Sequence, residues 1–345
     1  MLRFEPWEGS LDEWGEILRT YPDRQIFQTP AWMRFIAESQ GGAKPVIAAL
    51  KDGNSTVGHF AGLEVRRAGF RILGSPFVGW TTPYMGVRLV PGVEKRAALA
   101  ALIHFAFDQS RFAHLEVMDR QLSLCDGERV FQEHSEIKGW EVDLTPTEEE
   151  ILARMYNDRR RCIRKSKRDG VVIEECWDES FVEDYYPQLE DVFAKQSLVP
   201  TYSRERIRLL IRHLLPTGML LLLRARDRSG RCIATGIFPA LNDRVYFFGG
   251  ASWRDGQILH PNEPIQWYAM RYWKQRGITA YDMCGGGEYK KQYGGREISV
   301  LWFRSSKYRW VSQLRMAAAA AFRLRQKWLG WWRGRGEKHG AARDE

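Results

Sequence analysis

The residues best suited to chemistry stand close together near residue 285, in a segment that contains a carboxylate, three successive glycines and a lysine. Asp282 ends a stretch that reads as a short strand, and Gly285 and Gly286 open the glycine run. Successive glycines let a ligand approach the backbone and leave N–H groups able to point at an anion, so we predict that these two bind substrate. We also predict that Asp282 holds or deprotonates an amine and that Lys290 neutralises a phosphate or a developing oxyanion. A flexible turn with a solvated run of charges is the alternative interpretation.

A second candidate is a strongly basic helix that ends at Gly170. Arg160 and Arg164 are four residues apart and are therefore neighbours on one helix face, where two guanidinium groups can bind one phosphate. A basic face that only meets solvent explains this pattern equally well. Both arginines are candidate substrate-binding residues.

The sequence lacks the motifs of several other common enzyme chemistries. The sequence has no G-x-S-x-G nucleophile motif, no H-E-x-x-H metal motif and no Walker loop, and its seven histidines are remote from one another. We therefore expect neither metal-dependent nor triad hydrolysis, and no bound metal. The five cysteines are odd in number and never spaced as C-x-x-C, which favours a reducing compartment.

Periodicity and turn residues predict an α/β protein, and the pattern of helices and strands is clearer in the second half of the chain than in the first. In that half we expect a helix at about 148–170, a strand at 171–176, helices at 180–196 and 203–214, strands at 219–226, 232–240 and 244–250, a helix at 264–276 and a strand at 280–284. A cruder copy of this order is seen in residues 1–120. Since 345 residues exceed what one core usually serves, we predict two α/β domains, 1–144 and 145–308, followed by a tail at 309–345.

In the first domain, the segment from Gly69 to Gly86 is rich in Gly, Pro, Ser and Thr with interleaved aromatic residues. Such a composition predicts a loop that lines a cleft. We take Tyr84 as its candidate substrate-binding residue.

The tail carries most of the excess charge of the chain, with nine Lys and Arg against three Asp and Glu from Arg309 onward, out of a net charge of +9. Its apolar residues recur at steps of four and three and predict a basic amphipathic helix with one seam, formed by Trp310, Leu314, Ala317, Ala321, Leu324, Trp328 and Trp331. Tryptophan beside arginine favours a membrane interface, whereas the small alanines favour packing of the seam on the second domain. We expect no signal peptide and no membrane span, and hence a cytoplasmic protein that could lie peripherally on the inner face of the membrane.

Two stretches resemble a known family. Arg160 to Val171 looks like the R-x-N-I/V-R-x-A/S-x-K/R-x-G-V helix of the Fem-like transferases, with Cys162 where that family usually has Asn. Tyr281 to Gly294, with Tyr289 before the lysine, resembles their Y-D-F/M-x-G ending followed by F/Y-K-x-x-F/Y-G.

The resemblance extends to segments between and before these stretches. Gly249-Gly-Ala, the pair Pro261-Asn262, and Pro264 with Trp267 three residues later match the strand, loop and helix that precede the ending. Phe27 to Trp32 is similar to the F-x-Q/S-x-x-W opening. The likeness spans about residues 25 to 305 and is stronger in the second half.

This resemblance implies two tandem GNAT-like domains, each a mixed, mostly antiparallel sheet flanked by helices, with the acceptor in the groove between them. It also implies transfer of an acyl group to an amine, with Asp282 and Lys290 as catalytic residues. Our candidate substrate-binding residues, from these motifs and from the loop of the first domain, are Arg160, Arg164, Tyr281, Gly285, Gly286, Tyr289, Asn262, Trp267 and Tyr84. The family's coenzyme A loop, R/Q-x-x-G-x-G/A, is not evident in this sequence, so the resemblance leaves the donor open.

The leading functional hypothesis is an N-acyltransferase that uses acyl-CoA, with acetyl-CoA favoured, and an amine on a sugar, peptide or lipid-linked cell-envelope precursor. The first alternative is a Fem-type enzyme that uses aminoacyl-tRNA and therefore binds tRNA. The second is a catalytically inactive, basic binding module at the membrane periphery. The oligomeric state does not follow from the sequence.

Overall fold

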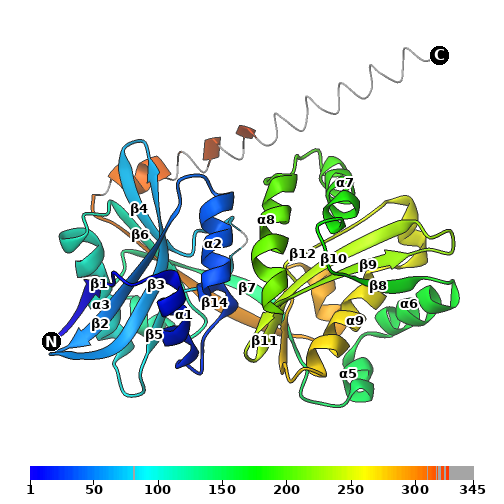
Figure 1. The fold of residues 1–345 in the computed structure, drawn as a ribbon, viewed down its shortest axis with the longest axis horizontal. Coiled ribbons are helices and arrows are strands. Elements are labelled where there is room, and N and C mark those ends of the chain that lie inside the picture. Colours follow the sequence, from blue (N-terminus) through cyan, green and yellow to red (C-terminus); the bar gives the residue numbers. More distant parts are fainter. Residues whose placement is uncertain (81, 309, 316, 318–319, 322–323, 326–345) are drawn as a thin grey trace, which may run out of the picture. The chain divides into compact units, whose positions relative to one another are not determined.

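The computed structural model describes residues 1–80, 82–308, 310–315, 317, 320–321 and 324–325, which form two compact units (Figure 1). The first unit consists of Met1–Glu141, Met283–Lys290 and Arg296–Gln313; the second consists of Val142–Asp282 and Lys291–Gly295, with the described residues from Leu314 on. Each unit is an α/β structure that contains both strands and helices, as the sequence predicts.

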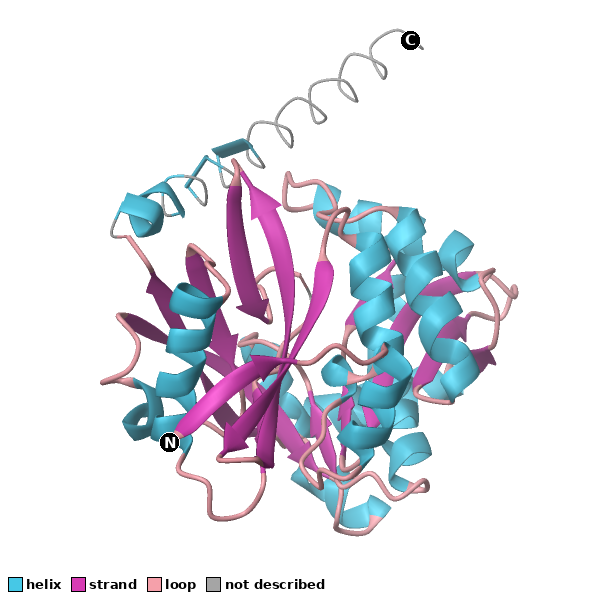
Figure 2. Cartoon of the chain, turned by 60° about the vertical axis from the view of Figure 1, so that its left-hand side comes forward, coloured by secondary structure: helices cyan, strands magenta, loops and turns pink. Residues whose placement is uncertain are grey.

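The strands of the first unit, drawn like all strands in magenta in Figure 2, follow the order β1-β2-β3-β4-β6-β14-β7. These strands are β1 (Leu2–Pro6), β2 (Lys44–Asp52), β3 (Ser55–Arg67), β4 (Phe70–Ser75), β6 (His114–Met118), β14 (Arg296–Ser306) and β7 (Glu133–Asp143), and β5 (Val87–Leu89) pairs with β3. Only β4 and β6 run parallel; the other pairs in this order are antiparallel. The sheet is thus mixed and mostly antiparallel.

Capping residues explain where the first helices begin. The helices of this unit are α1 (Leu11–Arg19), α2 (Pro30–Ser39), α3 (Lys95–His104) and the short α4 (Leu124–Gly127). Ser10 and Glu13 form a capping box at α1, and the Thr29 side chain accepts from the backbone of α2, whose first residue is Pro30. Burial of their apolar faces then holds these helices on the sheet, with Trp14 and Trp32 fully buried.

The core of the first unit gathers side chains from both ends of the chain. Phe303 of β14 is fully buried with Phe131, their ring centroids 5.4 Å apart, in a cluster that also includes Phe4, Phe60 and Phe105. Apolar burial of this extent is the main source of stability in a domain. The strand that brings Phe303 is therefore part of the first unit's core.

The second unit has a sheet in the order β8-β9-β10-β11-β13, with β12 also paired to β10. Its strands are β8 (Val172–Cys176), β9 (Leu220–Arg226), β10 (Cys232–Leu241), β11 (Arg244–Tyr246), β12 (Gly249–Ser252) and β13 (Ala280–Asp282). Its helices are α5 (Glu148–Arg154), α6 (Asn157–Arg168), α7 (Phe181–Ala194), α8 (Arg204–Leu214) and α9 (Asn262–Lys274). The predicted order of helix, strand, helices, three meander strands, helix and strand is confirmed except at two places, where the first helix and the third meander strand are each divided in two.

Two details of the second unit differ from the sequence prediction. The helix expected at 148–170 is two helices, because Met155 and Tyr156 are extended and the Tyr156 N–H bonds to the Gln292 carbonyl at 3.0 Å. The strand expected at 244–250 is broken after Tyr246, where β11 runs parallel to β13 and β12 stays with β10. The expected end at Gly170 is confirmed, since that residue has φ +88° and closes α6.

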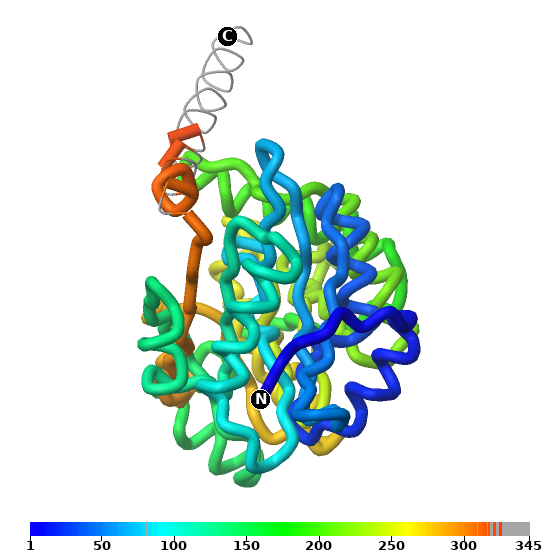
Figure 3. The backbone as a smooth tube through the Cα atoms, turned by 90° about the vertical axis from the view of Figure 1, so that its left-hand side faces the viewer, coloured from blue at the N-terminus to red at the C-terminus, as the bar shows by residue number. Residues whose placement is uncertain are grey.

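The strand β14 joins the first unit although it lies late in the chain. It pairs with β6 on one side and with β7 on the other, and Figure 3 shows this orange stretch beside the cyan and teal ones. The first compact unit therefore includes β14, whereas the predicted ranges 1–144 and 145–308 assign this strand to the second domain. The ranges themselves stay a prediction.

Two sequence expectations concern membranes. Among the residues that the structure describes, no helix is long and apolar enough to cross a bilayer. Of the predicted tail seam, Trp328 and Trp331 lie outside the described residues. Trp310 is described and its ring lies 5.2 Å from that of Phe70 in the first unit. The alternative of a seam packed on the second domain is not decided by this contact.

Candidate functional site

The strand β12 presents an open backbone edge. It pairs with β10 through Ile237, Gly236, Thr235 and Ala234, and among the described strands it has no second partner. The Trp253 N–H donates to the Ile233 carbonyl at 3.0 Å, so in this antiparallel register the N–H groups of Gly249 and Ala251 face β10, whereas those of Gly250 and Ser252 turn away from it. An unpaired strand edge of this kind offers donors to a carbonyl of a bound ligand.

Polar side chains gather where β12 ends. The Ser252 hydroxyl, which is buried, accepts from the Asn262 amide and from the Gln257 amide, each at 3.3 Å. Asn262 is the first residue of α9, so the predicted substrate-binding Asn262 lies beside the open strand edge. Trp267 follows on the same helix, half-buried.

Asp282 occupies the carboxyl end of the parallel pair of β11 and β13, opposite Tyr246. Its side chain is fully buried, and its carbonyl accepts from the Phe247 N–H at 2.8 Å. The carboxyl ends of parallel strands are where α/β proteins bind ligands. The neighbouring Tyr281 is also fully buried and its hydroxyl donates to Gln266 of α9. The segment 247–248 and the polar end of β13 are thus joined by a backbone hydrogen bond.

The basic helix α6 packs against α9 through residues other than the predicted pair. Arg159 forms an ion pair with Glu263, which is 8% exposed, and Lys165 lies 3.4 Å from the His260 Nε2 atom. Arg160 instead donates to the Ala153 carbonyl of α5 at 3.1 Å and to the Asn157 amide oxygen at the start of α6.

Arg164 is exposed on α6, and it forms no ion pair with any residue that the structure describes. The two predicted arginines are therefore on one helix but do not share a partner. Their binding of a phosphate stays a prediction.

Three groups able to bind a metal meet at the contact of α6 with α9. The ligand atoms of Cys162, His260 and Glu263 all lie within 4.8 Å of one another. However, Arg159 already binds the carboxylate and Lys165 approaches the imidazole, so two cations compete with any metal for these groups. Burial raises the pKa of the Cys162 thiol, which disfavours the thiolate that metals bind.

The glycine turn lies in the first unit, where it is held against β7. The Met283 N–H donates to the Trp140 carbonyl at 2.8 Å, and Gly285 has φ +74°, a conformation that favours glycine. A Cβ on Gly286 would lie only 3.4 Å from the Lys138 carbonyl oxygen, so the turn approaches the strand closely.

Lys290 closes the same turn from the other side. Its ammonium group donates to the carbonyl of Cys284 and lies 3.5 Å from that of Gly285. The Tyr289 ring is half exposed and 5.9 Å from the ammonium. Gly285, Gly286, Tyr289 and Lys290 are therefore brought together, whereas Asp282 belongs to the second unit.

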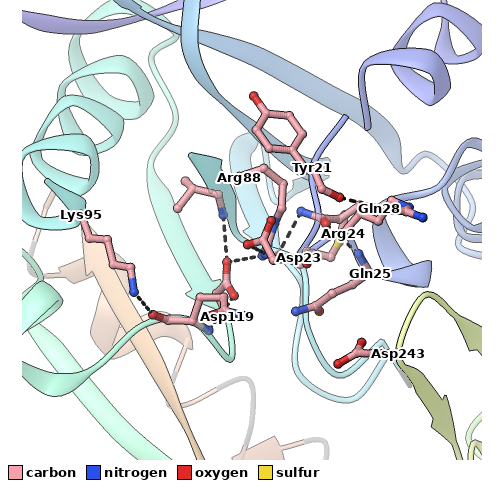
Figure 4. Close-up of polar contacts among 12 residues, drawn as sticks. Tyr21, Asp23, Arg24, Gln25, Gln28, Arg88, Lys95, Asp119 and Asp243 are labelled. Carbon is pink, nitrogen blue, oxygen red and sulfur yellow. Dashed lines mark hydrogen bonds and ion pairs between the residues drawn. The ribbon is translucent and has the colours of Figure 1, made fainter. Parts of the chain in front are cut away.

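Tyr84 lies in the predicted loop of the first unit but is buried there, 5% exposed, with the Arg120 guanidinium 5.5 Å from its ring centre. The loop ends at a buried ion-pair network (Figure 4). Arg88, fully buried, bonds to Asp119 and, at 2.5 Å, to Asp23, and it donates to the Met85 carbonyl at 2.8 Å. The network fixes the loop and hence the position of Tyr84.

Sequence reasoning missed several of these polar residues, namely Ser252, Gln257, Gln266, Arg159 and Lys165. The first three are uncharged and stand in no motif that the family pattern contains. Arg159 and Lys165 lie in a strongly basic helix, where charge alone does not distinguish one position from another.

Comparison with known proteins adds a family model and several folds. Residues 153–293 match the model of the acetyltransferase (GNAT) domain, and this range holds β8 to β13, α6 and α9. It includes Asn262, Asp282 and Lys290. No curated protein matches the sequence.

Solved structures match over most of the chain. The crystal structure of FemX has a TM-score of 0.67 at 12% identity and covers 86% of this chain and 96% of its own. A putative lysylphosphatidylglycerol synthetase C-terminal domain from Agrobacterium fabrum has a TM-score of 0.54 at 12% identity, covering 92% and 96%. A tandem GNAT protein from the clavulanic acid biosynthesis pathway has a TM-score of 0.51 at 10% identity, covering 89% and 98%. At these identities the likeness shows the fold alone.

Proposed function

We propose that the chain is a Fem-like member of the GNAT-fold proteins and that it transfers an acyl group from acyl-CoA to an amine. The observation that carries the proposal is the open edge of β12 inside the segment that matches the GNAT domain. In that segment the edge stands next to Ser252 and Asn262.

The reaction needs a neutral amine about 3 Å from the thioester carbon and donors for the oxyanion that forms there. We assign the donors to the N–H groups of Gly250 and Ser252, which turn away from β10. The amine nitrogen forms a bond to the acyl carbon, the carbon–sulfur bond breaks, and the released thiolate of coenzyme A takes up a proton. In this scheme the Asp282 carboxylate either accepts the proton that the amine loses or holds the amine in place by a hydrogen bond.

The phosphates of the donor need cations or N–H groups. Lys165 and the exposed Arg164 on α6 supply cations close to the start of α9, whose first N–H groups add a partial positive charge. The family model supports acyl-CoA as the class of donor, and acetyl-CoA is its simplest member. We propose Lys290 as a further phosphate or oxyanion contact, which requires it to leave the carbonyl of Cys284.

For the acceptor we propose an amine on a cell-envelope precursor, either a small sugar or peptide or a lipid-linked form of one. The similarity of fold to FemX and to a putative lysylphosphatidylglycerol synthetase supports an envelope acceptor. The exposed basic residues of α6 favour one alternative, in which aminoacyl-tRNA is the donor, because a basic helix also attracts RNA.

Thermal unfolding of the full chain distinguishes the donors. Coenzyme A or acetyl-CoA at about 100 times its Kd should stabilise the protein by about 2.7 kcal/mol, a clear rise in Tm. Stabilisation by charged tRNA but not by coenzyme A would reject acyl-CoA in favour of the alternative donor. Binding of acyl-CoA with no release of coenzyme A in the presence of any amine tested would support the inactive binding module instead.

Two variants test the residues. Asp282→Asn and Lys290→Ala should each lower turnover at least about tenfold, which corresponds to about 1.4 kcal/mol of transition-state stabilisation, without unfolding the chain. Asp255→Asn, on an exposed carboxylate, and Lys291→Ala, next to Lys290 and exposed, are the matched controls and should leave the rate unchanged. Wild-type rates in Asp282→Asn and Lys290→Ala would remove both residues from the reaction.

A further inference from the structure

We propose that one end of the first unit binds an anionic lipid bilayer. The docking surface, as we call it, consists of Arg66, Arg67, Phe70, Arg111, Tyr308 and Trp310. It combines the tip of the β3–β4 hairpin with the residues that follow β14. The inference does not depend on the proposed acyl transfer.

Backbone contacts bring these segments together. Arg67 pairs with Phe70 across the tip of the hairpin. The Ala113 N–H donates to the Arg71 carbonyl at 2.8 Å, and the Lys307 N–H donates to the Ala113 carbonyl at 3.0 Å. Figures 1 and 2 show the hairpin tip and the helical turn after β14 at the same end of the unit.

Aromatic rings form the apolar part of the docking surface. Trp310 meets Phe70 edge to face at 5.2 Å and stacks on Tyr308 with centroids 6.1 Å apart and planes 11° apart. Trp310 remains 45% exposed and Tyr308 51% exposed. Trp and Tyr rings with a polar edge prefer the level of the lipid head groups, where both the apolar face and the polar group are satisfied.

Cations surround these rings. The Arg66 side chain is 73% exposed and lies 3.5 Å from Glu64, and Lys307 lies 3.8 Å from Asp108. Arg67 and Arg111 are exposed, so four cations stand here against two carboxylates. Arg111 forms no ion pair among the described residues, and it lines a hollow of about 350 Å³ together with Asp108, Tyr308 and Phe70. Arg71 is not available because it donates to both oxygens of Glu64. The positive charge of the docking surface is therefore complementary to anionic head groups.

The sequence that follows has the same character. From Arg309 on, nine Lys and Arg face three Asp and Glu, and tryptophan recurs at 310, 328, 331 and 332. Basic residues with tryptophan are the composition of segments that lie in a membrane interface. RNA also binds basic residues and aromatic rings, but it does not require the further apolar residues that recur in this sequence at helical spacing.

Co-sedimentation of the full chain with phosphatidylcholine vesicles, with and without phosphatidylglycerol, tests the docking surface. Wild type should bind the anionic vesicles and release them at about 0.5 M NaCl, where charges are screened within a few Å. Arg66→Glu with Arg67→Glu should lower the partition coefficient at least about tenfold, because each basic residue contributes to the attraction. Trp310→Ala should lower it at least about threefold through loss of the ring.

The controls match charge and exposure. Arg3→Glu with Arg19→Glu reverses two exposed charges on β1 and α1, and Trp177→Ala removes a ring that is 55% exposed in the second unit. Both should bind within about twofold of wild type. Circular dichroism confirms that each variant is folded.

Two results would overturn the proposal. One is anionic-vesicle binding that is unchanged in both the Arg66→Glu, Arg67→Glu variant and Trp310→Ala. The other is a wild-type chain that binds tRNA but not anionic vesicles, which would assign the positive charge to nucleic acid. Loss of vesicle binding with intact acyl transfer would leave the proposed function standing, so the two failures are distinguishable.

Discussion

Lowering the pH should destabilise the protein through His59, a buried histidine of β3. The ring is 6% exposed, shares a hydrogen bond of 2.7 Å with the Tyr21 hydroxyl and lies 5.6 Å from the ring of Trp14. Burial, with the charge of Lys51 as a smaller cause, lowers the pKa of His59 to about 4. Burial likewise raises the pKa of Tyr21 to about 12, so its hydroxyl stays protonated over this range.

The sign follows from the two pKa values. Above about pH 6.5 the histidine is neutral in the folded and the unfolded chain, and it has no effect on stability. As the pH falls from 6.5 towards 4, the unfolded chain binds a proton that the folded chain does not, so the free energy of unfolding falls. The full difference of about 2.5 pKa units corresponds to about 3 kcal/mol, of which about 2 kcal/mol is lost by pH 5.

The assay is urea unfolding of wild type and His59→Gln at about pH 7.5 and pH 5. The glutamine variant loses part of the bond to Tyr21 at both pH values, so only the change with pH is compared. Wild type should lose about 2 kcal/mol more than the variant between the two conditions. An equal loss in both proteins, or a histidine NMR signal that is absent from His59→Gln and titrates near 6.5, would refute the reasoning.

The remaining predictions concern the first unit. Arg88→Met should lower the free energy of unfolding, measured with denaturant, by about 3–5 kcal/mol, because it leaves Asp119 buried and unpaired. Addition of Asp119→Leu should recover part of this loss. A loss that the second change leaves untouched would argue against the ion pair. Gly86→Ala should lower the free energy of unfolding by about 2–4 kcal/mol, since φ is +79° and a Cβ would lie 2.1 Å from the Asp119 carboxylate. Gly53→Ala, in open space at φ +57°, should lower it by only about 1 kcal/mol. Similar losses in the two variants would contradict the clash at Gly86. Cys125 is the exposed one of the cysteines, all of which are described, so a thiol reagent should show one fast phase that Cys125→Ser removes.

Local signals in the sequence were sufficient for most of the second unit. The stop at Gly170 follows from a glycine that can adopt positive φ, and the meander follows from turn residues between apolar strands. The break at Tyr156 could not be predicted in this way, because the carbonyl that holds it belongs to Gln292, far along the chain. The break in the strand after Tyr246 likewise depends on parallel pairing with β13, a non-local contact.

The face of α6 was within reach of the sequence but was not identified. Cys162 and Ser166 are the buried residues of this helix, and they are four apart, so they mark its packed side. Arg159, three residues before Cys162, lies on the same side and meets Glu263. The predicted Arg160 and Arg164 were chosen by charge and spacing alone, which do not distinguish a packed face from an exposed one.

The chain order of β14 has a consequence for synthesis on the ribosome. The strand that fills the place between β6 and β7 emerges only after Val142–Asp282 of the second unit has been made, so until then the nascent first unit has an incomplete sheet and an unfilled position where Phe303 belongs. The intervening segment is free to fold earlier from contacts of its own. A fragment that stops before residue 296 should therefore expose unpaired strand edges and aggregate, even though it contains every residue up to the end of the glycine turn.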